Sequence, residues 1–94
     1  MRIRDFQNMM KHIYFKRDFE RGIVGTFNWF VGEVEELKEA IEEGKKKAVE
    51  SEFADVFAWL ASLANVVNVD LERAVISKYD NRCPKCRLNP CECP

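Results

Sequence analysis

Two pairs of acidic residues have a spacing that suits the binding of a metal ion. Glu33 and Glu36 are three residues apart in a segment with helical periodicity, so they share one face of that helix. Glu52 and Asp55 have the same spacing in a second such segment. Glu33 and Asp55 project among apolar side chains, where an ionised and unpaired carboxylate is costly. A hard divalent cation, Mg²⁺ or alternatively Mn²⁺, is the simplest partner for these two carboxylate clamps, because such ions prefer oxygen ligands.

Other partners remain open for the clamps. A lysine or arginine from elsewhere in the fold would also neutralise a buried carboxylate. A di-iron site of the Glu-x-x-His type is disfavoured, because neither clamp has a histidine at that spacing. The only histidine, His12, lies at the edge of an apolar helical stripe and is interpreted as structural. Four further glutamates are interpreted as a solvated helix face: Glu35, Glu39, Glu42 and Glu43.

The elements that must position the clamps are all predicted to be helices. Apolar periodicity predicts them over residues 3–15, 26–43, 48–67 and 70–81. Gly22 and Gly25 indicate a loop after the first helix, and Thr26 is expected to cap the second. A short connection after Gly44 makes the second and third helices antiparallel neighbours, and Asp70 is expected to cap the fourth. Residues 1–82 are therefore predicted to form an all-α antiparallel bundle of about four helices.

The third predicted helix is unusually apolar. Twelve of the fifteen residues from Phe53 to Val67 are apolar, and they surround the helix axis. A helix that is apolar on all sides needs cover on all sides. Because the other three helices are too few to provide it, we expect a second copy of the chain to complete the bundle. The sequence therefore predicts a homo-oligomer, either a dimer or a dimer of dimers.

Length and charge limit the classes of partner. Ninety-four residues correspond to one domain, and fifteen basic against sixteen acidic residues argue against a chain that coats nucleic acid. The first residues lack the apolar core of a secretory signal. The longest apolar stretch is interrupted by Asp55, Ser62 and Asn65 and is too short to span a bilayer. We therefore expect a cytoplasmic protein with neither membrane nor nucleic acid as its partner.

The last twelve residues, 83–94, form a tail that is rich in cysteine and proline. The four cysteines of the chain all lie there: Cys83, Cys86, Cys91 and Cys93. The C-x₂-C spacing of the first two suits a zinc site, whereas C-x-C and the short gap between the pairs are less usual. Three states remain open: a bound Zn²⁺, disulfides in one of three pairings, and a flexible reduced tail. If a metal binds, its role is structural, because four thiolates leave no open coordination position.

Three segments together resemble a known family. They read T-F-N-W-F-V-G-E-V-E-E-L-K-E-A-I, E-F-A-D-V-F-A-W-L and N-V-D-L-E-R-A-V-I-S-K-Y-D-N-R. Their order and spacing resemble the MazG-like nucleotide pyrophosphohydrolases, all-α enzymes with an E-x-x-E and E-x-x-D signature. The resemblance covers residues 26–82. Glu35 departs from it, because many relatives have glycine there, but this side chain projects to the solvent side.

The resemblance implies an activity and a set of site residues. The activity is Mg²⁺-dependent hydrolysis of a nucleoside triphosphate, a deoxynucleotide or non-standard nucleotide in a house-cleaning role, to the monophosphate and pyrophosphate. The implied metal ligands are Glu33, Glu36, Glu52 and Asp55. Glu36 is also the expected base for the attacking water. Lys78 and Asn81 match the family's lysine and asparagine that contact substrate, although a solvated helix end explains them equally well from the residues alone.

Five further residues each have two candidate roles. Trp29 and Trp59 lie one turn from the clamps, where an aromatic ring would stack on the base or, more commonly, pack in the core. Arg17, Asp18 and Arg21 would contact phosphates or be solvated.

Two alternative functions remain: phosphoribosyl-ATP pyrophosphohydrolase of histidine synthesis, and a non-catalytic interaction protein with a metal-binding tail.

Overall fold

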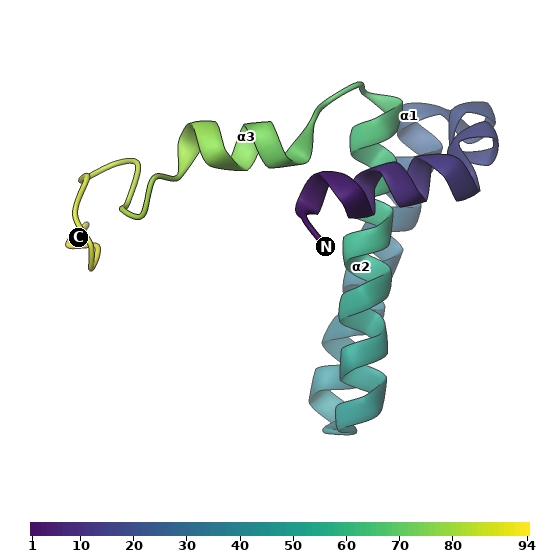
Figure 1. Ribbon diagram of the computed structural model, residues 1–94. Coiled ribbons are helices and arrows are strands. Elements are labelled where there is room, and N and C mark those ends of the chain that lie inside the picture. Colours follow the sequence, from purple (N-terminus) through teal and green to yellow (C-terminus); the bar gives the residue numbers. More distant parts are fainter.

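The fold is all-α, as predicted. The computed structural model describes residues 1–94 and contains three helices and no strand. They are α1 (Ile3–Glu43), α2 (Lys46–Val66) and α3 (Leu71–Lys78). The second part of α1 runs beside α2, while the first part crosses the upper end of α2 and α3 leads away from both (Figure 1).

The first helix is longer than predicted and contains a single break. Gly22 has φ 82° and ψ 177°, which a residue without Cβ adopts at little cost, and the chain is helical on both sides of it. The predicted loop before Thr26 is therefore wrong: the expected first two helices are one element with a bend. Thr26 is not an N-cap but is fully buried inside α1, and its hydroxyl donates to the backbone oxygen of Asp18 at 3.4 Å.

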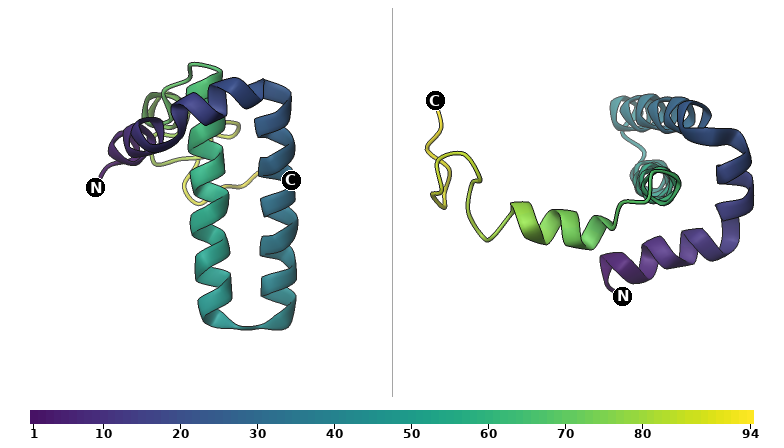
Figure 2. Two further views of the ribbon diagram at one scale, coloured as in Figure 1. Left: turned by 90° about the vertical axis from the view of Figure 1, so that its right-hand side faces the viewer. Right: turned by 90° about the horizontal axis from the view of Figure 1, so that it is seen from above.

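The connection between α1 and α2 is as short as expected. Gly44 lies in the left-handed region at φ 74°, and its N–H donates to the carbonyl oxygens of Ala40 and Ile41 at 3.1 and 3.2 Å. The chain then reverses, and α2 begins at Lys46. The second part of α1 and α2 are consequently antiparallel neighbours, as the left view of Figure 2 shows.

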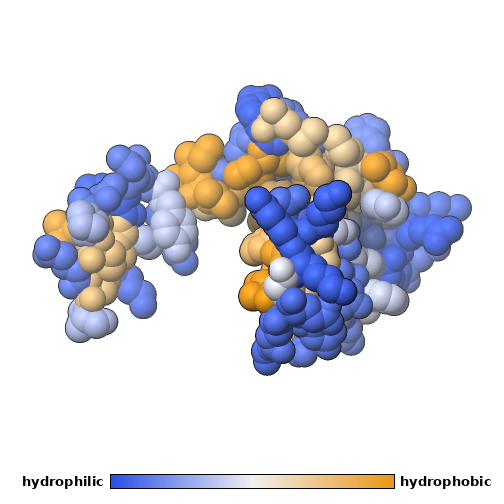
Figure 3. Space-filling view, turned by 90° about the horizontal axis from the view of Figure 1, so that it is seen from below, coloured by the Kyte–Doolittle hydropathy of each residue, from blue (hydrophilic) through white to orange (hydrophobic).

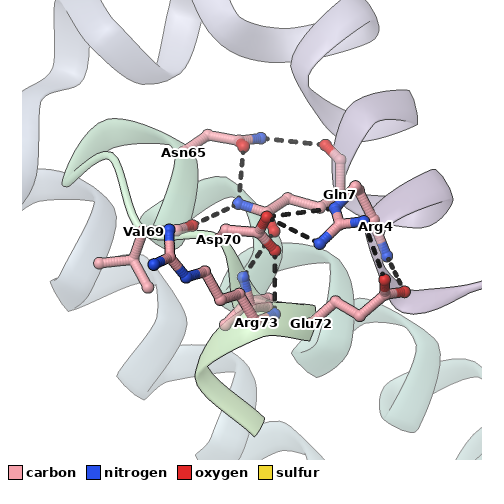
Figure 4. A network of polar contacts seen from close by, with 8 residues as sticks. Arg4, Gln7, Asn65, Val69, Asp70, Glu72 and Arg73 are labelled. Carbon is pink, nitrogen blue, oxygen red and sulfur yellow. Dashed lines mark hydrogen bonds and ion pairs between the residues drawn. The ribbon is translucent and has the colours of Figure 1, made fainter. Parts of the chain in front are cut away.

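A network of amide hydrogen bonds joins the start of α1 to the end of α2. The Gln7 side chain donates to Asn65 Oδ1 at 3.0 Å and to the Val69 carbonyl oxygen at 2.7 Å. Its own oxygen accepts from the Leu71 N–H at 2.9 Å, and Asn65 Nδ2 donates to the Gln7 carbonyl oxygen at 3.1 Å. Every polar atom of the buried Gln7 amide is thereby used (Figure 4).

Asp70 caps α3, as predicted, by accepting from the Arg73 N–H at 3.1 Å. Arg4 ties this helix start to α1, with ion pairs of 3.1 Å to Asp70 and 3.1 Å to Glu72 (Figure 4). The predicted extension of this helix to residue 81 is wrong, because α3 ends at Lys78. Asn81 adopts φ 57°, a left-handed conformation that asparagine tolerates and that does not continue a helix.

One chain buries few of its residues. Only eight of the 94 are buried, and the apolar ones among them are Met10, Ala40, Ala61 and Ala64. On α2, Phe53 is 56% exposed and Phe57 is 40% exposed. The other helices of a single chain therefore do not cover all sides of α2. Apolar side chains are also exposed along α3, including Val75 and Ile76 (Figure 3). No single helix has the length and apolar content needed to cross a membrane. The helices α2 and α3 have that length and apolar content only when they are counted together, and a 98° bend separates them.

Candidate active site

The antiparallel pairing of α1 and α2 brings the two carboxylate clamps together. Oxygen atoms of Glu33, Glu36 and Glu52 all lie within 4.8 Å of one another. Glu33 and Glu36 come from the second part of α1, and Glu52 comes from the first turns of α2. No lysine or arginine forms an ion pair with any of the three. The alternative of a basic partner within the chain is therefore not realised.

The electrostatics of this carboxylate cluster are unfavourable without a cation. The Oε2 atoms of Glu33 and Glu52 are buried and have no hydrogen-bond partner. Burial, followed by the charges of Glu36, Asp55 and Glu52, raises the pKa of Glu33 above its ordinary value. Burial, followed by the charges of Glu36 and Asp55, likewise raises the pKa of Glu52. Orphaned oxygens that converge from two helices are the donor set that a hard divalent cation takes, so these residues fit the implied metal.

Asp55 lies at the edge of the cluster. It is outside the group of three converging residues, but its charge contributes to the raised pKa of both Glu33 and Glu52. It shares a cavity with Trp59 and Ser62 of the same helix. The expectation that Asp55 is held on a core-facing surface is wrong for the single chain, where the residue is exposed.

The cavity beside Asp55 has a volume of about 250 Å³ and lies between the first part of α1 and α2. Asp18, which lines it, is 2% exposed and pairs with Arg21 at 2.8 Å. Its other oxygen, Oδ2, is buried without a partner. Sequence reasoning placed Asp18 and Arg21 in a loop and missed this pairing; their three-residue spacing would have indicated it had the helix been expected to continue.

The two tryptophans stack on each other. The ring centroids of Trp29 and Trp59 are 5.5 Å apart, and their planes differ by 8°. The Arg21 guanidinium lies 4.8 Å from the centroid of the Trp59 ring. Gly25 leaves room for this arrangement, because an added Cβ there would lie 2.7 Å from Cγ of Arg21. Trp29 remains 56% exposed, so a planar ligand can still reach it.

The two predicted substrate contacts, Lys78 and Asn81, are not brought to the carboxylate cluster of the same chain. Lys78 is the last residue of α3, and this helix points away from the pair formed by α1 and α2 (Figures 1 and 2). Lys78 lines a different cavity, of about 690 Å³, together with Arg82 and Lys85. Asn81 follows α3, and its carbonyl oxygen accepts from Asn89 Nδ2 of the tail at 2.7 Å.

The cysteine tail forms a second cluster. All four cysteines are free thiols, so the predicted disulfide alternative is not realised in this structure. Their sulfur atoms lie within 4.8 Å of one another, on the far side of α3 from the carboxylate cluster (Figure 1). The chain thus contains two candidate metal sites of opposite character, one with oxygen ligands and one with sulfur ligands.

Comparison with known protein families agrees with the carboxylate geometry. The family model described as MazG nucleotide pyrophosphohydrolase domain matches residues 24–87, about two thirds of the chain. The match includes both carboxylate clamps, Lys78 and Asn81, and leaves out the last seven residues with Cys91 and Cys93. No curated protein sequence matches the chain. Since the family match spans the helices that build the carboxylate cluster, the chain belongs to the MazG nucleotide pyrophosphohydrolase domain family.

Proposed function

We propose that this protein hydrolyses nucleoside triphosphates between the α and β phosphates, giving the monophosphate and pyrophosphate, in a reaction that needs Mg²⁺. The observation that carries the proposal is the convergence of Glu33, Glu36 and Glu52 within 4.8 Å, with two buried oxygens left without partners. The family match supports the same reaction class. Deoxynucleotides or non-standard nucleotides are the proposed substrates.

The cation would be held by four carboxylates: Glu33, Glu36, Glu52 and Asp55. Mg²⁺ bound there would neutralise the charge of the phosphates and would lower the pKa of a bound water. Glu33 and Glu52 contribute the buried oxygens, which lack any other partner. Asp55 stands between the cluster and the adjacent cavity, and would fix the substrate end of the site.

Glu36 is the proposed proton acceptor. It is the exposed member of the converging group, so the solvent reaches it while Glu33 and Glu52 are committed to the cation. In the proposed step, the oxygen of water bonds to phosphorus, the bridge between the α and β phosphates breaks, and the proton of the water passes to the Glu36 carboxylate. Pyrophosphate leaves with the electron pair of the broken bond.

The nucleoside part of the substrate is proposed to contact the tryptophan pair. Trp29 is exposed over half its surface and lies one helical turn before Glu33, so a base can stack on it next to the phosphates. Trp59 is already held between Trp29 and Arg21 and supports that platform. Such stacking is tolerant of base identity.

The protein is further proposed to act as a homo-oligomer, a dimer or a dimer of dimers. The radius of gyration is 15.5 Å, whereas a compact domain of 100 residues has about 13 Å. A single chain also exposes aromatic residues of both long helices, among them Phe27 and Phe53. In a dimer, α3 of one chain can approach the carboxylate cluster of its partner, which would bring Lys78 and Asn81 to the phosphates. A stable monomer by sedimentation would overturn this part of the proposal.

The reaction is tested by product analysis. The purified chain is incubated with Mg²⁺ and each common ribo- and deoxynucleoside triphosphate, and with phosphoribosyl-ATP. Release of pyrophosphate with the monophosphate supports the proposal. A marked preference for phosphoribosyl-ATP would instead identify the protein as the phosphoribosyl-ATP pyrophosphohydrolase of histidine synthesis. Release of orthophosphate would overturn the proposed cleavage position. No Mg²⁺-dependent turnover of any substrate would overturn the proposal and favour a non-catalytic role.

A further inference from the structure

The four sulfur atoms of the tail have the spacing of ligands around one ion. The Sγ atoms of Cys83 and Cys93 are 3.7 Å apart, and those of Cys86 and Cys91 are 3.8 Å apart. All four lie within 4.8 Å of one another. A tetrahedral ion with metal–sulfur bonds of about 2.3 Å holds its sulfur atoms about 3.8 Å apart. These two separations therefore match the edges of such a tetrahedron.

The backbone of the tail is folded so that the thiols converge. The Cys83 N–H donates to the Leu88 carbonyl oxygen at 2.9 Å, and the Arg87 N–H donates to the Cys83 carbonyl oxygen at 2.8 Å. These bonds close a tight loop over residues 83–88, with Arg87 in the left-handed region at φ 63°. The loop turns the first two cysteines toward the last two, whose own C-x-C spacing is bridged by the Cys93 N–H on Cys91 Sγ at 3.4 Å.

Backbone N–H groups point at the sulfur atoms and favour their charged form. The N–H groups of Glu92 and Leu88 face the sulfur atom of Cys86. The N–H groups of Cys86 and Lys85 likewise face the sulfur atom of Cys83. The thiolate is the form that binds metal, and such N–H donors orient the ligands of a site from the outer shell.

The tail has no apolar core that would explain this convergence. None of its residues is buried, and Leu88, its one large aliphatic side chain, is 45% exposed. A segment of this size does not bury enough surface to hold a fixed structure, and small segments usually rely on a metal or a cross-link. The link to the rest of the chain is polar: Asn89 Nδ2 donates to the Asn81 carbonyl oxygen at 2.7 Å.

We propose that Cys83, Cys86, Cys91 and Cys93 bind a single Zn²⁺ in a structural site that holds the tail against the end of α3. Four thiolates fill the coordination of the ion, so the site has no open position for chemistry. Its effect on the rest of the molecule is to fix the segment of Asn81, which the tail contacts directly. The proposal is independent of the proposed hydrolysis, because it rests on residues outside the carboxylate cluster.

The site is tested by the metal content of the intact chain, purified under reducing conditions without chelator or added metal. Elemental analysis is expected to give one zinc per chain in the wild type and none in C86S. Glu33→Gln, which alters only the carboxylate cluster, should retain its zinc. Replacement of the zinc by Co²⁺ is expected to give the visible absorption of tetrahedral thiolate coordination. One iron per chain instead of zinc, or unchanged zinc in C86S, would overturn the assignment.

A second measurement uses the wild type alone, in case C86S fails to fold. A thiol reagent is added to the native chain before and after a zinc chelator, and free zinc is followed with a colorimetric dye. All four thiols are expected to be protected before chelation and to react afterwards, with release of one zinc. Full thiol reactivity before the chelator is added, or thiols missing because they are oxidised, would overturn the proposal.

Discussion

Acidic side chains in two regions of this molecule have opposite surroundings. At the junction of α1 and α3, Asp70 accepts from the Arg73 N–H and pairs with Arg4, and these contacts lower its pKa. In the carboxylate cluster, Glu33 and Glu52 face other carboxylates, and their pKa values are raised. The junction has its counter-charges within one chain, whereas the carboxylate cluster has none there.

Burial alone does not separate the two regions. The Glu72 side chain at the junction is only 12% exposed, yet Arg4 pairs with it at 3.1 Å. Glu33 is also partly buried, but its Oε2 has no partner at all. The presence of a counter-charge is the difference between the two regions. The unpartnered carboxylates of the cluster oppose folding of the metal-free chain, which supports the proposed cation site.

The largest expected effect comes from neutralising one clamp. Glu33→Gln should lower Mg²⁺-dependent turnover at least about 100-fold, because even outer-shell partners of a metal contribute 10–100-fold to affinity or activity. The amide keeps the size of the side chain but loses the charge that holds the cation. Turnover is measured by pyrophosphate release, and Mg²⁺ affinity by calorimetry.

Glu35→Gln is the matched control, because Glu35 lies on the same helix but is exposed and makes no ion pair. It should keep the turnover of the wild type. If both variants lost activity equally, helix charge in general would be responsible and the special position of the clamp would be refuted. Near-normal turnover in Glu33→Gln would remove Glu33 from the site.

The next effect concerns the satisfied region. Gln7→Ala should lower the free energy of unfolding by about 1–3 kcal/mol, the usual cost of leaving buried polar groups without partners. The groups left without a hydrogen-bond partner are the Asn65 amide oxygen, the Val69 carbonyl oxygen and the Leu71 N–H. Urea denaturation measures the change, and Mg²⁺ affinity should stay as in the wild type.

Asn8→Ala controls for the loss of an amide at the same helix start. Asn8 is exposed and its side chain makes no hydrogen bond, so its replacement should change stability by less than about 0.5 kcal/mol. An equal loss in both variants would mean that the amide network around Gln7 does not stabilise the junction.

Local patterns predicted the parts of the fold that depend on local spacing. The clamps follow from three-residue spacing on helices, and the hairpin follows from Gly44 and its short connection. The bonds between Gln7 and Asn65 join residues 58 positions apart, which no periodicity reveals. Both polar atoms of the Asn65 side chain are used in these bonds.

Glycine was the ambiguous signal. Gly22 and Gly25 together indicated a loop, but Gly22 alone makes the bend, while Gly25 stays helical and leaves space for Arg21. The helical continuation through this segment brings Asp18 to the cavity beside Asp55, which a loop would not require. The carboxylates of the candidate site were therefore predictable from the sequence. The residues of α1 that line the adjacent cavity, such as Asp18, were not.

A smaller effect tests the claim that the cluster opposes folding. In magnesium-free buffer, Glu33→Gln should melt at a higher temperature than the wild type at pH 7. The pKa of Glu33 is 4.5 in the unfolded chain and is raised above 4.5 in the folded chain. Between these two pKa values, the folded chain therefore binds more protons than the unfolded chain. Stability of the wild type therefore falls as the pH rises through that window, and the variant's advantage should disappear below pH 4.5. The buffer contains no chelator, so that the proposed zinc site of the tail is left undisturbed.

The smallest effect is expected at Asp70, with the opposite dependence on pH. Its pKa is lowered below 3.8 by the Arg73 N–H and by Arg4, so its contribution to stability is fully present above that value and is lost as the pH falls through the lowered pKa. Asp70→Asn keeps a capping oxygen but loses the ion pair, and should melt slightly below the wild type at pH 7 and no lower than it in acid. Melting curves across the pH range, recorded for Asp70→Asn and Glu33→Gln side by side without magnesium, should therefore differ from the wild type in opposite directions. Shifts of the same sign would mean that neighbouring charge does not distinguish the two regions, and the carboxylate cluster would lose its reason to hold a cation.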